Sequence, residues 1–362
     1  MQAGSPPSGM RGRLLAAGGA LGVAVVLGSV TPAAAEGAGA AAAPTTPAAS
    51  AAVTRCQITD PRLPELSGLV DVGGRTLAMN DGGDQVVVYA LDAACRVVDV
   101  HTVPVDPYDP EDMAVGADGT VWLADTGDNT RHRSTVALHA LRPDGSVALF
   151  RLRYPDGPHD AEALLLPPDG TPYLVTKEVL GASGVYRPVS AMVDGGTVAL
   201  AKVAGVNFSL TGTEGGPVGR AGQLMVTGGA VARDGHHLAL RTYTDAYVWP
   251  LTGSDVTGAL ATHPVRIALP DSPQGEAISF TPDGKQIVVA SEGLPSAVTV
   301  LPVPSAPAPA SASVGAIPSL TDLTRSGLSP ITTGLIAAAV ATVVVWLGGK
   351  LRRRNSVRSN SL

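Results

Sequence analysis

The sequence is poor in cysteine, aromatic residues and charge. Of its 362 residues two are cysteine, 4% are aromatic and 15% are charged. Two cysteines so far apart in the chain, Cys56 and Cys95, do not make a metal-binding motif. Outside the cytoplasm such a pair oxidises, so the sequence predicts one disulfide bond between them.

Several catalytic and sorting motifs are absent as well. No G-x-S-x-G nucleophile elbow occurs, which argues against a serine hydrolase of that type, and no H-E-x-x-H motif indicates a zinc protease. No LPxTG-type motif precedes the C-terminal apolar run, so covalent transfer to a cell wall is not indicated. The informative patterns are instead at the two ends of the chain and in a repeat between them.

The N-terminus has the pattern of an export signal. Arg11 and Arg13 precede an apolar run of small residues from Leu14 to Val30, and Ala33-Ala34-Ala35 offers a cleavage site. An uncleaved membrane anchor is the alternative. The short apolar region and the cleavage site favour a signal peptide over residues 1–35.

A second apolar run lies near the C-terminus. Residues 331–347 carry no charge, and a membrane-spanning helix needs about 17–25 residues. The basic residues that follow, Lys350, Arg352, Arg353, Arg354 and Arg358, favour the cytoplasmic side. A buried helix of a soluble core is the alternative. We expect a transmembrane helix over 331–347 with a basic cytoplasmic tail over 348–362, in a single-pass type I protein of the cell membrane that displays the rest outside.

Charge is divided unevenly along the chain. Residues 36–322 hold all 31 acidic residues and 17 of the 25 Lys and Arg, a formal net charge of −14. So acidic a segment argues against nucleic acid as a partner and suits cations or the basic surface of an extracellular ligand or protein. An Ala- and Pro-rich linker over 36–54 and a Pro, Ala and Ser-rich stalk over 304–330 leave residues 55–303 as the folded domain.

A repeat fills this domain. Each copy has an apolar strand, a Gly-Gly or Asp-Gly turn, a second apolar strand and then a third. The copies are aligned on Gly68, Asp112, Glu162, Gly229 and Glu276, which are 44, 50, 67 and 47 residues apart. Such periods with several strands each are typical of propeller blades.

We therefore predict an all-β propeller of five blades. Six blades are the alternative if the longest interval hides a partial blade between Thr197 and Val226, and a β-sandwich is a further alternative. The last copy shows three clear strands, so the segment around Cys56 is expected to add a fourth and to close the ring. The disulfide to Cys95 would then pin this closing strand to the first blade.

Carboxylates recur at one phase of the repeat, at the start of the strand expected to be innermost. Like charges that converge on a channel repel one another, and calcium prefers such hard oxygen ligands. The metal ligands predicted at this phase are Glu111, Asp112, Glu162 and Glu276. Asp125, Asp128 and Asn129, which follow the second strand of their copy, are predicted to add further oxygen ligands. Asp and Asn also cap turns by bonding nearby backbone groups, which is the alternative for each of them.

A second group of residues is expected to bind a ligand beside this channel. Its members are Asp160, Lys177, Glu178, Arg241, Tyr243 and Glu292. Lys177 and Arg241 each stand as the only base after the second strand of their copy, where a base suits an anionic group. Ion pairs with neighbouring carboxylates are the alternative.

Several of these segments resemble the exported bacterial phytase-like ("esterase-like activity of phytase") β-propellers. The resemblance rests on the segments 109–114, 125–129, 160–164, 241–244 and 274–277. It implies a propeller over about residues 60–303 and, as one possibility of function, a calcium-dependent phosphoesterase. The chain departs from genuine propeller phytases because it lacks a dense Lys and Arg cluster for phosphate.

Fold does not decide function, so three functions stay open. The first is a membrane-anchored binding module for an extracellular ligand or protein, with an acidic, calcium-binding channel. The second is the phytase-like phosphoesterase. The third is a structural adhesion module.

Overall fold

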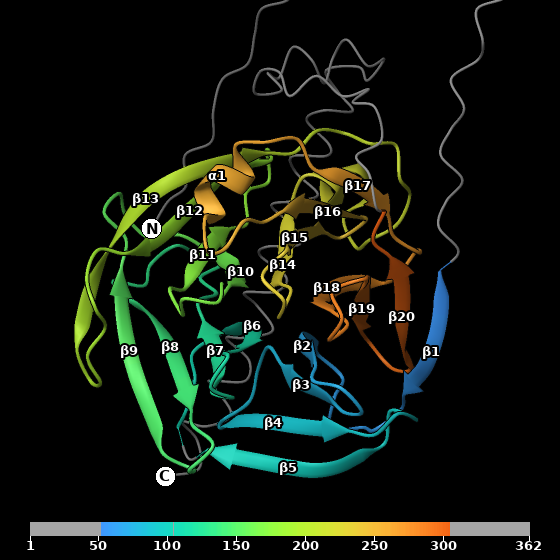
Figure 1. Cartoon of the computed structure of the whole chain (residues 1–362), viewed down its shortest axis with the longest axis horizontal. Helices are drawn as coiled ribbons and strands as arrows, with labels where there is room; N and C mark the ends of the chain where they lie inside the picture. Colours follow the sequence, from blue (N-terminus) through green and yellow to red (C-terminus); the bar gives the residue numbers. More distant parts are fainter. Residues whose placement is uncertain (1–51, 104, 305–362) are drawn as a thin grey trace, which may run out of the picture. The chain divides into compact units, whose positions relative to one another are not determined.

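Almost all of the regular structure is β-strand. The computed structural model describes residues 52–103 and 105–304. Within them the exceptions are η1 (Gly219–Gln223) and α1 (Val256–Leu260), both five residues long. The chain therefore folds as an all-β, propeller-like structure (Figure 1).

The twenty strands of these residues form five groups of four. In chain order the groups are β2 (Leu66–Asp71), β3 (Thr76–Asn80), β4 (Val86–Leu91), β5 (Val97–Val103); β6 (Pro110–Val115), β7 (Val121–Asp125), β8 (Val136–Leu141), β9 (Val147–Arg153); β10 (Ala161–Leu165), β11 (Tyr173–Thr176), β12 (Ala182–Pro188), β13 (Thr197–Asn207); β14 (Val226–Val231), β15 (His237–Thr242), β16 (Asp245–Pro250), β17 (Val265–Ala268); and β18 (Gln274–Phe280), β19 (Gln286–Glu292), β20 (Ser296–Pro302), β1 (Val53–Ile58). Neighbouring strands in each group are antiparallel. The three strands predicted for each copy are present, and the first four groups each add a fourth, outer strand that the repeat did not reveal.

Tight turns join the first two strands of each group. Gly119 and Gly284 turn with φ angles of 84° and 67°, in a region where a residue with a side chain is strained. Asp-Gly at these positions follows from that requirement, because aspartate and glycine favour such hairpins. The turns send the second strand back along the first and so build each sheet from local contacts.

The inner strands enclose a common axis. Contacts run from β2 to β6, β10, β14 and β18 and back to β2. One apolar cluster lies between each neighbouring pair of sheets, such as Met79, Met113 and Leu123 between the first and second. The apolar residues of the strands are buried between neighbouring sheets. The inner strands β2, β6, β10, β14 and β18 lie around the axis (Figure 1).

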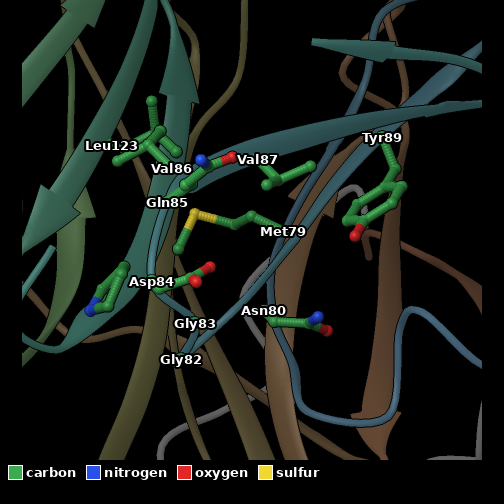
Figure 2. Close-up of a pocket in the computed structure, with 11 residues that line it drawn as sticks. Met79, Asn80, Gly82, Gly83, Asp84, Gln85, Val86, Val87, Tyr89 and Leu123 are labelled. Atoms are coloured by element: carbon green, nitrogen blue, oxygen red, sulfur yellow. The ribbon is translucent and has the colours of Figure 1, made fainter. Parts of the chain in front are cut away.

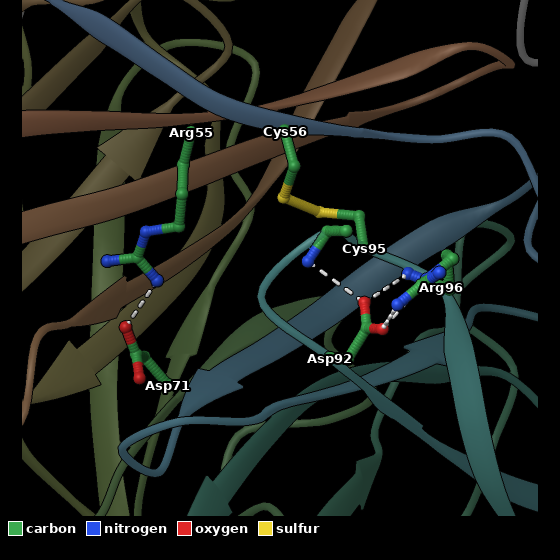
Figure 3. The surroundings of a disulfide bond; sticks show 7 residues. Arg55, Cys56, Asp71, Asp92, Cys95 and Arg96 are labelled. Carbon is green, nitrogen blue, oxygen red and sulfur yellow. Dashed lines mark hydrogen bonds and ion pairs between the residues drawn. A yellow bond between two sulfur atoms is a disulfide. The ribbon is translucent and has the colours of Figure 1, made fainter.

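The N-terminal strand closes the ring, as the sequence predicts. β1 pairs antiparallel with β20, with Cys56 opposite Val298. The predicted disulfide is confirmed: Cys56 is bonded to Cys95 in the turn between β4 and β5, at a Cα–Cα distance of 5.8 Å. Arg55 adds a 2.6 Å ion pair to Asp71 of β2 (Figure 3). The last sheet is thereby tied covalently and electrostatically to the first.

The longest interval of the repeat is filled without a further sheet. Residues 197–225 hold the 11-residue strand β13 and the short η1. The start of β13 also pairs in parallel with β9, which joins the second and third groups into one eight-stranded sheet.

No helix within 52–103 and 105–304 is long and apolar enough to cross a membrane. The predicted signal peptide, most of the linker, the stalk, the transmembrane helix and the basic tail lie outside the described residues. The strands themselves run from Val53 to Pro302, close to the predicted domain of 55–303.

Candidate cation-binding centre

Every inner strand is irregular at the same place. The register of each shifts near its start. In four strands one residue is skipped, namely Ser67, Glu111, Glu162 or Thr227, and in β18 the shift spans Glu276 and Ala277. A β-bulge leaves a residue out of the ladder and redirects its side chain. Three of the five positions therefore bring a glutamate to the axis. The other two carry hydroxyls that bond the neighbouring strand, Ser67 to the carbonyl of Glu111 and Thr227 to that of Gly275.

Three carboxylates form the core of the centre. One oxygen from each of Glu111, Asp160 and Glu162 lies within 4.8 Å of the others. The three residues are 5%, 6% and 2% exposed. Asp160 Oδ1 accepts the amide of Asp128 at 2.8 Å, whereas the buried Oε2 of Glu162 has no hydrogen-bond partner. An unpartnered buried carboxylate oxygen is costly, and a bound cation would satisfy it.

The acids of the centre raise one another's pKa values. Burial, followed by the carboxylates of Glu162, Asp109 and Asp160, raises the pKa of Glu111 well above its ordinary value. Burial and the neighbouring Asp160 raise the pKa of Asp109 to about 7. Burial and mutual repulsion thus disfavour the ionised form of these carboxyl groups, and a bound cation would relieve that repulsion.

A further group of acids adjoins this core. Burial, then Glu276 and Asp81, raises the pKa of Glu292, and one of its oxygens is buried without a hydrogen bond. Burial, then Glu276 and Glu65, raises the pKa of Asp81. Glu276 accepts a 3.2 Å bond from the amide of Gln274. Negative charge thus extends from the core toward the first sheet.

Lys177 is the base that enters the centre. Its Nζ lies 2.5 Å from Glu162 Oε1 and 5.2 Å from the centroid of the Tyr243 ring. Burial lowers the pKa of Lys177, but the carboxylates, Glu162 first, outweigh it and raise the pKa well above its ordinary value. The ammonium group of Lys177 forms an ion pair with Glu162. An ion pair with a neighbouring carboxylate is the alternative that the sequence left open to the binding of an anionic group.

Arg241, by contrast, joins neighbouring strands through hydrogen bonds to their backbone. It is 1% exposed and donates to the carbonyls of Ala277 at 2.8 Å and Ala290 at 3.1 Å. Burial lowers its pKa to about 10. The guanidinium links β15 to β18 and β19, and its bonds to carbonyls leave little of it to bind an anion.

The other predicted residues divide between turns and the surface. Asp125 accepts the amides of Tyr108 and Asp109, and Asp128 accepts those of His132 and Arg133, which is turn chemistry. Asn129 is exposed, and Glu178 pairs with Arg131 at 2.7 Å. The structure brings seven of the predicted residues to the axis: Glu111, Asp160, Lys177, Glu162, Tyr243, Glu276 and Glu292. Asp125, Asp128, Asn129 and Glu178 lie in the turns and on the surface around them.

Asp112 lies beside the centre, but its side chain bonds backbone amides of its own strand and of neighbouring strands. One of its oxygens accepts the amides of Leu164 at 2.8 Å and Gly229 at 3.1 Å, and the other accepts that of Met113 at 2.7 Å. Burial raises its pKa to about 8. The repeat alignment placed Asp112 at the phase of Glu162, but the bulge makes Glu111 the equivalent residue. A slip of one residue turns a side chain to the opposite face of a strand.

We predict that Asp112→Asn lowers the free energy of unfolding by about 2 kcal/mol without weakening cation binding. An amide keeps one acceptor oxygen and turns an NH₂ group toward backbone N–H donors. The adjacent change Glu111→Gln is the matched control and should do the reverse, weakening cation binding without lowering stability. Denaturant unfolding and calorimetry measure the two effects. Equal loss of cation binding in both variants would contradict this division of roles.

Asp109 was missed as a member of the centre, although a short pattern would have found it. Asp109-Pro110-Glu111 and Asp160-Ala161-Glu162 place an acid two residues before each bulged glutamate, and residues two apart share a face of a strand. Gly127 belongs to the same arrangement, because a Cβ there would collide with the carboxylates of Asp109 and Glu111.

Comparisons with known proteins establish no family for this chain. No family model and no curated protein matches the chain. Among solved structures it is similar to a gluconolactonase from Xanthomonas campestris (17% identity, TM-score 0.39, covering 66% of this chain and 72% of that one). It is also similar to the PQQ-bound aldose sugar dehydrogenase of Streptomyces coelicolor (11%, 0.37, 70% and 99%) and to the hydrazine synthase of Kuenenia stuttgartiensis (14%, 0.38, 68% and 97%). None of these supports the phytase-like group in particular, and likeness at this level assigns no activity, cofactor or substrate.

Proposed function

We propose that this chain is an exported, membrane-anchored β-propeller of five blades that binds an extracellular ligand or protein, and that its central channel holds a calcium ion. The observation that carries the cation site is the group of Glu111, Asp160 and Glu162 with its unpartnered Oε2 atom. The export signal, the membrane anchor and the location outside the cytoplasm rest on the patterns at the two ends of the sequence.

The donor set suits calcium. Glu111, Asp160 and Glu162 offer only oxygen, and Asp109 and Glu276 supply further carboxylates nearby. Calcium takes six to eight oxygen ligands in flexible geometry, whereas zinc prefers nitrogen and sulfur. The ion would neutralise carboxylates whose pKa values burial, and then neighbouring negative charge, now raise at Glu111, Asp160 and Glu162. It would also hold the inner strands β6 and β10 together.

Binding is better supported than phosphate-ester hydrolysis. A phosphoesterase needs basic groups to hold the anionic substrate beside the metal. Here Lys177 is paired with Glu162, and Arg241 bonds backbone carbonyls. A purely structural module would have no use for a buried, unpartnered carboxylate at the axis.

Calcium should stabilise the full chain measurably. At a concentration 100 times the dissociation constant, an ion that binds only the folded state adds about 2.7 kcal/mol. We expect calorimetric binding of calcium and a rise in melting temperature that EGTA reverses, with magnesium giving a smaller rise. If calcium produces neither heat nor a change in melting temperature, the cation site is wrong.

A further inference from the structure

Two arginines stand on the outer rim, where the second and third sheets join. There β9 and β13 run side by side in parallel (Figure 1). Arg151 lies opposite Thr197. Arg153 lies opposite Ala199. Residues opposite each other, and residues two apart along a strand, lie on one face of a sheet. The two arginines therefore stand beside two small residues of β13, and all four residues are exposed.

β12 adds a third arginine to this face. It pairs with the other side of β13 and places Arg187 opposite Ala201, which is two residues from Ala199. Val189 lies on the same face, where its amide bonds the carbonyl of Ala199 at 3.0 Å and its side chain is 60% exposed. Strand spacing and rise put the Cα atoms of Arg153 and Arg187 roughly 12 Å apart. We call this surface the rim face, made of Arg151, Arg153, Arg187, Val189, Thr197, Ala199 and Ala201.

The positive charge of the rim face is uncompensated. β9, β12 and β13 contain no Asp or Glu, and the ion pairs of the part of the chain that the structure describes involve none of the three arginines. Arg151 donates to the carbonyl of Gly195 at 3.2 Å, and Arg187 lies beside the hydroxyl of Tyr173. Asp194, in the turn between β12 and β13, accepts a backbone amide at 2.9 Å. The arginines thus remain available to an anion.

The rest of the domain suits an anion poorly. Residues 36–322 carry a formal net charge of −14, and carboxylates gather at the axis. The cavity of about 180 Å³ between the first and second sheets is lined by Met79, Leu123 and Asp84 among others, and its lining has no Lys, Arg or His (Figure 2). An anionic ligand would be repelled by these regions and attracted to the rim face.

The shape of the rim face favours a thin chain over a folded partner. It has no exposed aromatic residue to anchor a protein or to enter a lipid bilayer. Duplex DNA would bring a wide polyanion against the acidic remainder of the domain. A single polymer chain with spaced carboxylates can instead lie along Ala199 and Ala201, and each arginine can bind a carboxylate through two N–H groups.

We propose that the rim face binds an acidic polysaccharide, with its carboxylates on the three arginines and its sugar rings over Val189, Ala199 and Ala201. The polymer would be the extracellular ligand of the proposed function, on which this inference rests for its location. Calcium at the axis is not needed for it, so the calcium titration of the same protein tests the cation site separately.

Hyaluronate, which has one carboxylate in each disaccharide, is the probe. Calorimetric titration of the full chain in a neutral detergent with EGTA should show binding of hyaluronate and none of neutral dextran. Duplex DNA and polyglutamate, at equal concentrations of charge, should bind at least tenfold more weakly. In 1 M salt, where charges act over about 3 Å, hyaluronate binding should be lost. No binding of hyaluronate, or equal or tighter binding of DNA or polyglutamate, would overturn the proposal.

Two variants locate the site. The double change Arg153→Gln, Arg187→Gln should weaken hyaluronate binding at least tenfold, and it should leave the melting temperature unchanged because both side chains are exposed. Ala199→Glu places a carboxylate between the arginines and should abolish binding. The matched control, Arg62→Gln with Arg96→Gln, removes two charges from side chains that are 51% and 79% exposed and should weaken binding less than twofold. Equal weakening by the two double variants would show an effect of net charge alone and refute the proposal.

Discussion

Glu162→Gln is expected to lower the affinity for calcium by about 100-fold. The change removes one charged ligand from the group that Glu162 forms with Glu111 and Asp160. It also releases Lys177, whose ammonium group is now 2.5 Å from Glu162 Oε1. The site therefore loses a negative charge and gains an uncompensated positive one, and both changes oppose a cation.

Lys177→Met should act in the opposite direction. Removal of the ammonium group leaves the carboxylates of the centre without their counter-charge, so calcium should bind more tightly. For the same reason the protein without calcium should melt at a lower temperature than the unaltered chain, because like charges repel.

Calorimetry on the full chain measures both variants against one control. Asp99→Asn removes a carboxylate on β5, the outer strand of the first sheet, where the side chain is 54% exposed. It should leave calcium affinity unchanged. If all three variants bind calcium alike, the axial group is not the site.

Loss of the Cys56–Cys95 bond should produce the largest fall in stability. The bond closes a sequence separation of 39 residues, for which the chain-entropy estimate is about 4 kcal/mol. We expect the double variant Cys56→Ser, Cys95→Ser to lower the melting temperature by roughly 10 °C. The effect has a structural reason beyond entropy, because the bond joins β1, which completes the last sheet, to the first sheet.

Hydrogen exchange can locate that effect. Without the bond the amides of β1 and β20 should exchange fastest, since the ring would open where its two ends meet. Reduction of the unaltered protein should reproduce the result. Val53→Ser, a change to serine at an exposed residue of the same strand, is the control and should leave the melting temperature nearly unchanged. A double variant that melts with the control would contradict the role of the bond.

The two cysteines and the repeat were informative because their signals are local. Asp-Gly turns require particular φ angles, and the alternation of apolar residues between them predicts strands at fixed intervals. β8, Val136–Leu141, is one such strand, the third of its copy. The outer strands of the first four sheets were missed, and β5 shows one reason, because five of its residues in a row are exposed.

The site was predicted less well, for a reason of register. Sequence spacing marked both Glu111 and Asp112, yet a bulge sends one to the axis and the other to the backbone of neighbouring strands. The pattern of carboxylates did not reveal the bulge, because the pairing of β6 with β7 fixes the position of the bulge. Arg241 was likewise expected at the channel and is used between sheets.

By itself, the sequence determined an acidic, all-β domain with a repeated hairpin, a disulfide bond and apolar runs at both ends of the chain. Periodicity, turn chemistry and net charge are properties of neighbouring residues and can be read without the fold. Only the tertiary structure decided which carboxylates converge, because Glu111 and Glu162 lie far apart in the chain and meet through the packing of β6 against β10. The same packing left Glu162 Oε2 buried without a partner, because its surroundings depend on how the inner strands meet at the axis.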